Sequence, residues 1–504
     1  QKMNTEIELS LSLSPSHNAE FKRKVAKLLP QASKPVEQLL VSIYYDTPAL
    51  DLAKRRMGLR LRKQGNQWIQ TVKFGQKGGG GLNARTEVEH ITHGQMLELA
   101  NIGHVEARDF LCDDKIATRL QPTFATHITR TLWEVEDKKG NIVELALDVG
   151  HIECDGREHP VNEVEIELKR GDVEAVFTLA LMLARNFALL PQQRSKAERG
   201  YRLFEQVPTT PVGAQDVKLD PEITPYEARR QVMLECLRQL QFNMVELGQH
   251  EDDMEFVHQA RVAIRRMRSA DKAFAALPTD SVWNQLEAKL QTLGQQLGEI
   301  RDRDVLVRET IAAVEPTLSD KLRLEPIKKR LMVQREALMQ ALREDLESPR
   351  IGMLLLQVLH WLHQDPPAEA AEGKLRPFTR DALNHRASSV DKLARRWHKL
   401  NEEQRHTLRK QVKKLRYTAE FFATLYDADK VKKYLSSQQA MQKVLGTMND
   451  AAVCRHMLET LASQYPETAF AGGAVAGWYE RIDLESSQRT EQALEALKEA
   501  RPFW

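Results

Sequence analysis

Glutamates that alternate with apolar residues are the side chains of this sequence best suited to chemistry. Glu6 and Glu8 lie two positions apart near the start of the chain, and Glu165 and Glu167 repeat the spacing. Carboxylates at i and i+2 of a strand project from one face, about 6–7 Å apart. Like charges this close repel each other unless a cation lies between them. The pattern therefore predicts a paired-carboxylate site for a hard divalent cation such as Mg²⁺ or Mn²⁺.

Other strand-like segments before residue 205 also carry charge on one face. A single segment of this kind is typical of an exposed antiparallel strand. The charged residues of the further segments are Arg60, Arg62, Lys73, Arg85, Glu87, Arg130, Glu134, Glu144 and Asp148. If these faces converge, about eight strands close into a small antiparallel barrel with room for one ligand.

Both signs of charge in one lumen suit a polyanion bound together with a metal. Arginine forks bind phosphate oxygens in pairs, and carboxylates hold cations that bridge phosphates. The glycine run 78–81 lacks the strand–loop–helix context of a phosphate-binding P-loop, so it is interpreted as a hairpin connection.

Length and composition narrow the class of protein. At 504 residues the chain is too long for one ordinary core, and its formal charge of +2 requires any charge-based function to depend on local clusters. The four cysteines are far apart in the sequence, which argues against a disulfide framework or a zinc site and predicts a reducing cytoplasm. No apolar run approaches membrane-spanning length, and no apolar signal core opens the chain.

The first 200 residues resemble a CYTH domain, or triphosphate tunnel metalloenzyme. The resemblance covers residues 4–204. It rests on the Glu-x-Glu opening, Tyr44-Tyr45-Asp46-Thr47-Pro48, Gly58-Leu59-Arg60-Leu61-Arg62, Thr71-Val72-Lys73, Arg85-x-Glu87, Leu147-Asp148-x-Gly150, Glu165-x-Glu167 and Ser195-Lys196-x-x-Arg199-Gly200-Tyr201.

The resemblance implies an eight-stranded tunnel that hydrolyses a triphosphate with Mg²⁺ or Mn²⁺. It implies metal ligands at Glu6, Glu8, Asp148, Glu165 and Glu167, and phosphate-binding residues at Arg60, Arg62, Lys73, Arg85, Arg130 and Lys196. Lys73, Lys196, Glu165 and Glu167 are the candidate catalytic residues, the lysines to position the attacking water or to stabilise charge.

One position departs from the family pattern. The family opening is Glu-x-Glu-x-Lys, and here the third position is Ser10. Loss of one charge-assisted phosphate contact costs about 1.5–3 kcal/mol, roughly ten- to a hundredfold in binding or rate. We therefore expect weaker activity than in a tunnel with the lysine.

The rest of the chain has helical periodicity and an internal repeat. Residues 206–222 are interpreted as a linker between a first domain, 1–205, and a helical domain, 223–504. The motif that begins at His258 recurs at His406, an offset of 148 residues (406 − 258), and the same offset relates a second motif downstream. The sequence therefore predicts two copies of one helical unit, 223–365 and 376–504.

Each copy carries a stripe of cations along one helix face. At 100° per residue, His258, Arg261, Arg265 and Arg268 share about one third of the circumference, with Arg266 outside it. His406, Arg409, Lys413 and Arg416, with Lys414 beside them, form the second stripe. A repeated stripe headed by histidine favours a polyanion surface over an ordinary solvated face. No Glu-x-x-His set accompanies these histidines, which argues against an iron-binding bundle.

These motifs resemble the CHAD family, the conserved-histidine α-helical domain, from residue 221 to about 504. The resemblance implies a two-fold pseudosymmetric helical bundle that binds inorganic polyphosphate. The predicted fold class is thus multidomain α+β, a β-tunnel followed by an all-α bundle.

The leading functional hypothesis is hydrolysis of inorganic triphosphate in the tunnel of a protein that also binds polyphosphate. One alternative is a polyphosphate-binding protein in which Ser10 has weakened the activity of the tunnel. Another is a nucleoside or thiamine triphosphatase or an adenylyl cyclase, although no aromatic-rich base pocket is evident. Nucleic acid and membrane are not expected partners, and the expected location is the cytoplasm, with polyphosphate granules as a further site.

Overall fold

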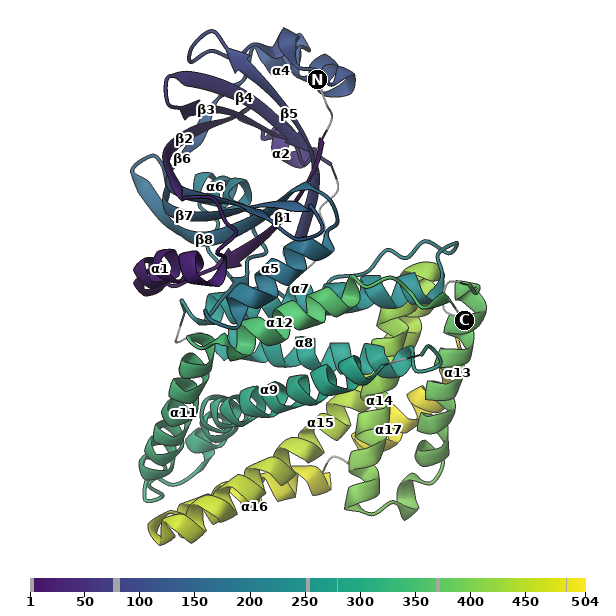
Figure 1. Ribbon diagram of the computed structural model, residues 1–504. Helices are drawn as coiled ribbons and strands as arrows, with labels where there is room; N and C mark the ends of the chain where they lie inside the picture. Colours follow the sequence, from purple (N-terminus) through teal and green to yellow (C-terminus); the bar gives the residue numbers. More distant parts are fainter. Residues whose placement is uncertain (1–3, 76–81, 251–253, 279, 369–371, 486) are drawn as a thin grey trace. The chain divides into compact units, whose positions relative to one another are not determined.

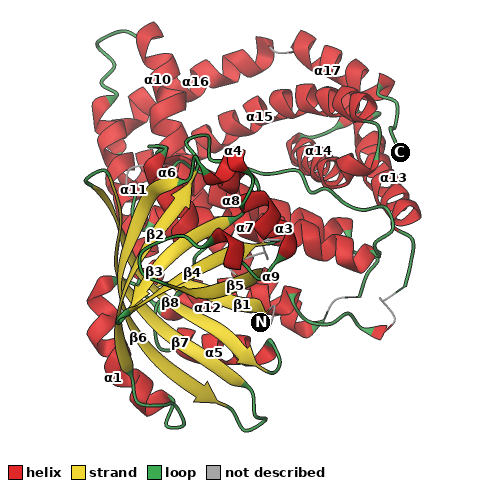
Figure 2. Cartoon of the chain, turned by 90° about the horizontal axis from the view of Figure 1, so that it is seen from above, coloured by secondary structure: helices red, strands yellow, loops and turns green. Residues whose placement is uncertain are grey.

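The computed structural model describes residues 4–75, 82–250, 254–278, 280–368, 372–485 and 487–504. The glycine run 78–81, interpreted above as a hairpin connection, lies outside the described residues. The chain forms two compact units, one of residues 1–211 with 345–360 and the other of residues 212–344 with 361–504. Figure 2 shows that the strands belong to the first unit, whereas the second is helical.

The first unit is built on an antiparallel barrel that closes through its first strand. The strands are β1 (Asn4–Ser12), β2 (Val36–Asp46), β3 (Gly58–Gln64), β4 (Gln67–Phe74), β5 (Leu82–Thr92), β6 (Gln121–Glu136), β7 (Ile142–Cys154) and β8 (Arg157–Arg170). The order β5-β4-β3-β2-β6-β7-β8-β1 becomes a ring because β1 also pairs with β5 (Figure 1). The predicted eight-stranded barrel is confirmed. A two-residue strand, β9 (Leu190–Pro191), adds to β1 outside this ring.

The helices of the first unit cover the barrel and fill one part of it. They are α1 (Asn18–Leu28), α2 (Asp51–Lys54), α3 (Val105–Leu111), α4 (Asp114–Ala117), α5 (Glu174–Ala184), α6 (Lys196–Phe204) and most of α12 (Pro349–Leu362). In α6, Ala197, Tyr201, Leu203 and Phe204 pack against an apolar cluster of lumen-facing residues that includes Tyr44.

Close packing of α6 depends on a glycine. A Cβ atom at Gly200 would lie 2.1 Å from the ring of Phe124 on β6, far inside van der Waals contact. The ring of Tyr201 then meets Phe124 edge-on at 5.1 Å. A capping box, in which Ser195 and Glu198 each accept from the other's backbone N–H, fixes where the helix begins. The start of α6 is therefore held rigidly next to β6, β7 and β8.

The second unit repeats one arrangement of three helices. The first set is α7 (Pro225–Leu247), α8 (Met254–Ala273) and α9 (Ser281–Val305), and the second is α13 (Leu375–Ala394), α14 (Glu402–Phe422) and α15 (Ala428–Gln464). Helices α8 and α14 begin 148 residues apart (402 − 254), the offset of the sequence motif, and they pack against each other. Helices α11 (Glu325–Leu346), α16 (Ala469–Glu485) and α17 (Ser487–Glu499) complete the unit.

The two repeats differ after their third helix. Helix α9 continues into a π-helical segment, Leu306–Ile311, whereas α15 runs on as an α-helix to Gln464. The hydroxyl of Tyr479 on α16 donates a hydrogen bond of 3.0 Å to the carbonyl of Thr310 in the π-helical segment. No described helix is both long and apolar enough to cross a membrane.

Candidate functional site

Both signs of charge line the lumen of the barrel. Strand register places Asp148 opposite Arg130 and Glu163, and Lys73 opposite Glu87. Across the β1–β8 pair, Glu8 lies opposite Glu167, and Ser10 lies opposite Glu165. None of these groups points into open solvent: the side chains of Lys73 and Glu165 are 20% and 15% exposed. The alternating segments therefore gather their charges around one cavity.

The most buried part of this lumen is a cluster of three carboxylates around one ammonium group. One oxygen from each of Asp148, Glu163 and Glu165 lies within 4.8 Å of the other two. Lys196, the first residue of α6, contacts all three, at 2.8 Å from Asp148. Arg130 donates two hydrogen bonds of 2.7 Å to Asp148 and another to Glu165. The three carboxylates are thus held together because cations lie among them.

The charges of this cluster shift one another's pKa values. Burial alone would raise the pKa of Glu165, but Lys196 and Arg130 lower it well below its usual range. Burial likewise opposes the charged form of Lys196, yet Asp148, Glu163 and Glu165 raise its pKa. Glu165 and Lys196 therefore stay ionised across the physiological pH range.

A second group of lumen charges lies on β1, β3, β4 and β5. Lys73 Nζ is 2.7 Å from Glu6 and 3.3 Å from Glu87, and Arg60 approaches Glu87 at 3.4 Å. Arg60 is only 8% exposed, and its Nε atom is buried with no partner among the described residues. Arg62 donates to the hydroxyl of Ser42 at 3.0 Å. This side of the lumen therefore has more hydrogen-bond donors than the described residues provide acceptors for.

Glu8 lies between the two charge groups. Burial, and next the charge of Glu165, raise the pKa of Glu8 to about 7, and Lys73 and Lys196 only partly offset them. None of the described cations forms an ion pair with Glu8. The position that carries lysine in the family pattern, Ser10, is buried on the same strand. Glu8 is therefore the lumen carboxylate most in need of a further cation.

The other predicted lumen residues lie at the margin of these groups. Glu167 pairs with Lys169 at 2.7 Å, and the same lysine approaches Glu144 at 3.7 Å. Arg85 lies opposite Glu6 in the β1–β5 register. The structure thus brings Asp148, Glu165, Arg130 and Lys196 into direct contact, and Glu6 and Lys73 into a separate contact.

The acidic cluster contains Glu163 and is bordered by Arg199, and neither residue was among the predicted site residues. Glu163 is 2% exposed and contacts both Lys196 and Arg199. Its sequence signal was present, because Glu163, Glu165 and Glu167 form one uninterrupted alternation on a single strand face. Arg199 follows Lys196 by three residues on α6, the spacing that places two side chains on the same helix face.

The acidic cluster fits a hard divalent cation. Its three carboxylates offer only oxygen atoms, the ligands that Mg²⁺ and Mn²⁺ prefer. The unpaired carboxylate of Glu8 lies close enough for Glu165 to raise its pKa. The donor set of the acidic cluster therefore suits such an ion.

Cations from both repeats meet where α8 packs against α14 in the second unit. Burial, and next Arg265, Arg409 and Arg261, lower the pKa of Lys413 to about 7. The pKa of Arg409 is lowered by burial and by Arg265 and Arg261, with partial compensation from Asp450. We call these four residues, Arg261, Arg265, Arg409 and Lys413, the cation cluster. Its members repel one another, so the cluster is a place where an external polyanion would be stabilised.

The remaining stripe residues surround this cluster or leave it. Arg268 pairs with Glu287 at 3.0 Å and Arg416 with Glu420 at 2.7 Å. Lys414 lies among Arg386, Lys272, Lys410 and Arg268, which together with burial lower its pKa. The pKa values of His258 and His406 are lowered by burial and by neighbouring cations. Arg266, which the helical spacing placed outside the stripe, is buried and donates to Gln239 at 2.7 Å.

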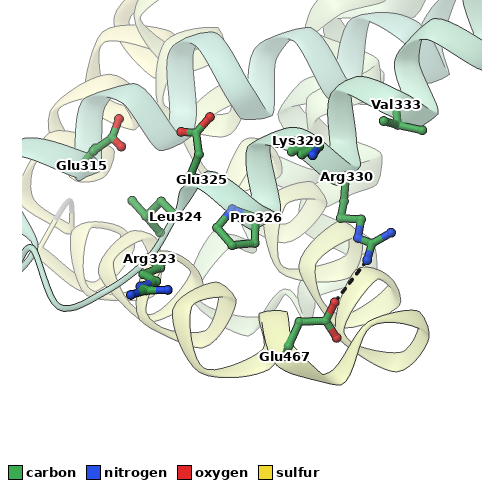
Figure 3. A pocket seen from close by; sticks show the side chains of 9 residues that line it. All are labelled: Glu315, Arg323, Leu324, Glu325, Pro326, Lys329, Arg330, Val333 and Glu467. Atoms are coloured by element: carbon green, nitrogen blue, oxygen red, sulfur yellow. Dashed lines mark hydrogen bonds and ion pairs between the residues drawn. The ribbon is translucent and has the colours of Figure 1, made fainter.

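A separate pocket of about 600 Å³ lies elsewhere in the second unit (Figure 3). It is lined by Glu315, Arg323, Leu324, Glu325, Pro326, Lys329, Arg330, Val333 and Glu467. Arg330 points toward Glu467, 3.5 Å away, and Lys328 neutralises Glu315 and Glu325. The pocket contains none of the residues predicted from the sequence, and its rim carries both signs of charge.

Comparisons with known proteins agree with this division of the chain. The model of the CYTH domain family matches residues 4–201, and that of the CHAD domain family matches residues 231–459. An inorganic triphosphatase of Haemophilus influenzae is 33% identical over 202 residues, which are 40% of this chain. The match spans about half of that relative's length, 55%.

The helical part is similar to a solved structure. The crystal structure of the CHAD domain from the plant Ricinus communis is 30% identical, with a TM-score of 0.52. The match covers 58% of this chain and 98% of the plant domain. Taken with the closed barrel and the repeated helices, these matches show that the chain belongs to the CHAD domain family and carries a CYTH domain ahead of its CHAD domain.

Proposed function

We propose that the barrel hydrolyses inorganic triphosphate to diphosphate and phosphate with the help of a divalent metal ion. The observation that carries this proposal is the buried contact of Asp148 and Glu165 with Arg130 and Lys196 in one lumen. Such a lumen offers cation-binding carboxylates beside phosphate-binding cations. The inorganic triphosphatase relative supports the choice of substrate.

The lumen residues divide into two roles. Glu6, Glu8, Asp148, Glu165 and Glu167 would hold Mg²⁺ or Mn²⁺, with Glu163 as a further candidate. A bound ion of this kind neutralises phosphate charge and lowers the pKa of a coordinated water. Arg60, Arg62, Lys73, Arg85, Arg130 and Lys196 would bind phosphate oxygens.

The lysines change partners when the substrate enters. The ammonium group of Lys196 contacts three carboxylates, and that of Lys73 contacts Glu6 and Glu87. A triphosphate would accept hydrogen bonds from both lysines, and the released carboxylates would be free to bind cations. Lys73 and Lys196 would then hold the phosphate chain in line with the attacking water.

Phosphate release distinguishes this function from its rivals. The purified chain would be incubated with triphosphate, diphosphate, ATP and long-chain polyphosphate, each with and without Mg²⁺ or Mn²⁺. We expect metal-dependent release chiefly from triphosphate. Absence of metal-dependent release from triphosphate contradicts the proposal, and faster release from ATP would favour a nucleotide-hydrolysing enzyme.

We propose in addition that the second unit binds inorganic polyphosphate at the cation cluster. Two helices present Arg261, Arg265, Arg409 and Lys413 to one another without enough acidic partners. Polyphosphate and DNA would both bind less tightly as salt rises, so salt dependence does not separate them. Competition between the two at one fixed salt concentration does, and we expect polyphosphate to displace DNA.

A second candidate function follows from Ser10. This residue is buried and lies opposite Glu165, where the family lysine would add a cation between Glu8 and Glu165. The alternative is a polyphosphate-binding protein with a nearly inactive tunnel. The variant Ser10→Lys separates the two: a large gain in triphosphate hydrolysis favours the binding protein, and an unchanged, already high rate favours the enzyme.

A further inference from the structure

Tyr44 faces the lumen but has no role in the chemistry described so far. Along β2 every second side chain is buried, and Tyr44 is 6% exposed. Strand register places it opposite Arg60 on β3 and Phe124 on β6. Its ring is stacked on that of Phe124, with centroids 4.6 Å apart and planes 17° from parallel. The stacked ring fixes the direction of the hydroxyl.

The cations beside the hydroxyl of Tyr44 can only donate hydrogen bonds. Arg60, Arg62 and Lys73 all lie close enough to act on its charge. Arginine and lysine have no acceptor atoms. Among the described residues, no group accepts a hydrogen bond from this hydroxyl. Its proton is therefore directed into the lumen without a protein acceptor.

A second donor without a partner in the described part of the chain lies on Arg60, the residue opposite Tyr44 on β3. The Nε atom of Arg60 is buried and has no partner among the described residues. A phosphate oxygen accepts hydrogen bonds from guanidinium and phenol groups alike. A buried donor with no acceptor costs free energy, which a ligand rich in acceptors would return on binding.

We propose that Tyr44 is a substrate-contacting residue, whose hydroxyl donates a hydrogen bond to the phosphate group held by Arg60, Arg62 and Lys73. This inference rests on the proposed function, because it takes triphosphate as the occupant of the lumen. Hydrogen bonds to charged groups contribute on the order of tenfold to a hundredfold in affinity or rate. Tyr44 thereby adds an uncharged hydrogen-bond donor to a site whose other phosphate-binding residues are arginines and lysines.

Electrostatics give this contact a signature of its own. Burial raises the pKa of Tyr44, but Arg60, Arg62 and Lys73 lower it below the ordinary value. A bound triphosphate would neutralise these cations and accept a hydrogen bond from the protonated phenol. Binding therefore raises the pKa of Tyr44, and the phenolate absorbance near 295 nm appears at higher pH when triphosphate is present.

The test compares Tyr44→Phe with Tyr45→Phe. Tyr45 is the adjacent residue on the opposite face of β2, where it packs against the cluster around Leu52 and Leu59 outside the lumen. Triphosphate binding is measured without divalent ions, by calorimetry and by absorbance titration at 295 nm, and hydrolysis is measured with Mg²⁺. We expect Tyr44→Phe to weaken binding or rate about tenfold to a hundredfold and to abolish the ligand-dependent absorbance shift. Tyr45→Phe should change affinity and rate less than twofold.

Each outcome decides the assignment. Equal affinities and rates for the two variants overturn it. It is also overturned if triphosphate does not change the pH at which the phenolate absorbance of the unaltered protein appears. If Tyr44→Phe fails to fold, that titration alone decides, since it needs no variant. Triphosphate that binds with the Tyr44 signature but is not hydrolysed supports the contact and contradicts the proposed hydrolysis. A protein that does not bind triphosphate at all overturns both.

Discussion

The lumen of the barrel and the cation cluster of the helical unit both concentrate charge, but they balance it in opposite ways. In the lumen, Lys196 and Arg130 contact the acids Asp148 and Glu165, and each sign stabilises the other. In the cation cluster, burial and like charges lower the pKa of Lys413 to about 7. The acids Asp148 and Glu165 are therefore balanced by cations of the protein itself, whereas the cation cluster is not balanced by acids.

This difference shows how the two sites would treat a polyanion. In the lumen a ligand must replace existing ion pairs, so its entry depends on what the released carboxylates can bind instead. In the cation cluster an anion only relieves repulsion. The lumen thus suits a selective reaction that requires a metal, and the cluster suits retention of any sufficiently dense anion. The following predictions test this contrast, from the largest expected effect to the smallest.

Removal of one lumen acid should break the balanced site. We expect Glu165→Gln to lower triphosphate hydrolysis about a hundred- to a thousandfold. Because it removes one of the three carboxylates that Lys196 contacts and one of the two that Arg130 contacts, it should also lower the free energy of unfolding by about 1–3 kcal/mol. Activity assays and urea unfolding measure the two effects. Glu158→Gln, a change of the same type on the exposed outer face, is the control, and equal effects from both would refute the balanced lumen.

Neutralisation of the cation cluster should remove polyphosphate binding. We expect the double variant Arg265→Gln, Lys413→Gln to weaken binding of long-chain polyphosphate about a hundredfold, by loss of two charge-assisted contacts. The control is Arg323→Gln, Lys329→Gln on the pocket rim of the same unit, which alters the net charge equally. Similar losses in both double variants, measured by fluorescence anisotropy, would mean that net charge and not the cluster attracts the ligand.

Removal of a charge should change the free energy of unfolding in opposite directions at the two sites. The free energy should fall in the lumen and rise in the cation cluster. We expect Lys413→Met to raise the free energy of unfolding by about 1 kcal/mol, since solvent screens part of the repulsion. The folded pKa of Lys413 is about 7 and lies below the ordinary lysine value of 10.5. The gain is therefore fully present below pH 7 and disappears as the pH rises through the unfolded pKa. Destabilisation at pH 6, relative to the exposed-site control Lys410→Met, would contradict this prediction.

Polyphosphate binding should take up a proton near neutral pH. Lys413 is about half protonated at pH 7 in the free protein, and a bound polyanion raises its pKa. Affinity should therefore fall by at most about tenfold per pH unit above pH 7. Calorimetry at pH 8 in buffers of different ionisation enthalpy measures the proton directly. Zero uptake, or equal uptake in Lys413→Met, would show that Lys413 does not contact the ligand.

The sequence was most informative where a short period repeats. Alternation predicted the charged strands, the family resemblance predicted their closure into a barrel, and the offset of 148 residues predicted two helical copies. The sequence could not predict which charges touch. That depends on register, which places Glu163 opposite Asp148, and on the position of α6, which brings Lys196 between them.

Contacts between helices were equally hidden from the sequence. The spacing predicted one stripe on each helix, but not that the stripes divide between a shared cluster and separate ion pairs. Arg268 forms an ion pair with Glu287, whereas Lys413 is repelled by Arg265 of the other repeat. These differences arise from packing partners far away in the chain. Tyr44 belongs to a motif of the CYTH resemblance, but only the strand register shows that it lies opposite Arg60.

The dual pairing of β1 has a consequence for how the protein is made. Asn4–Leu9 pair with β5, and Ile7–Ser12 pair with β8, whose Glu167 lies opposite Glu8. During translation the first strand leaves the ribosome long before its second partner is synthesised. Until then its edge is open to other chains, which is a hazard for aggregation. A nascent chain that stalls before β8 would therefore have two open strand edges, on β1 and on β7, for a chaperone to protect.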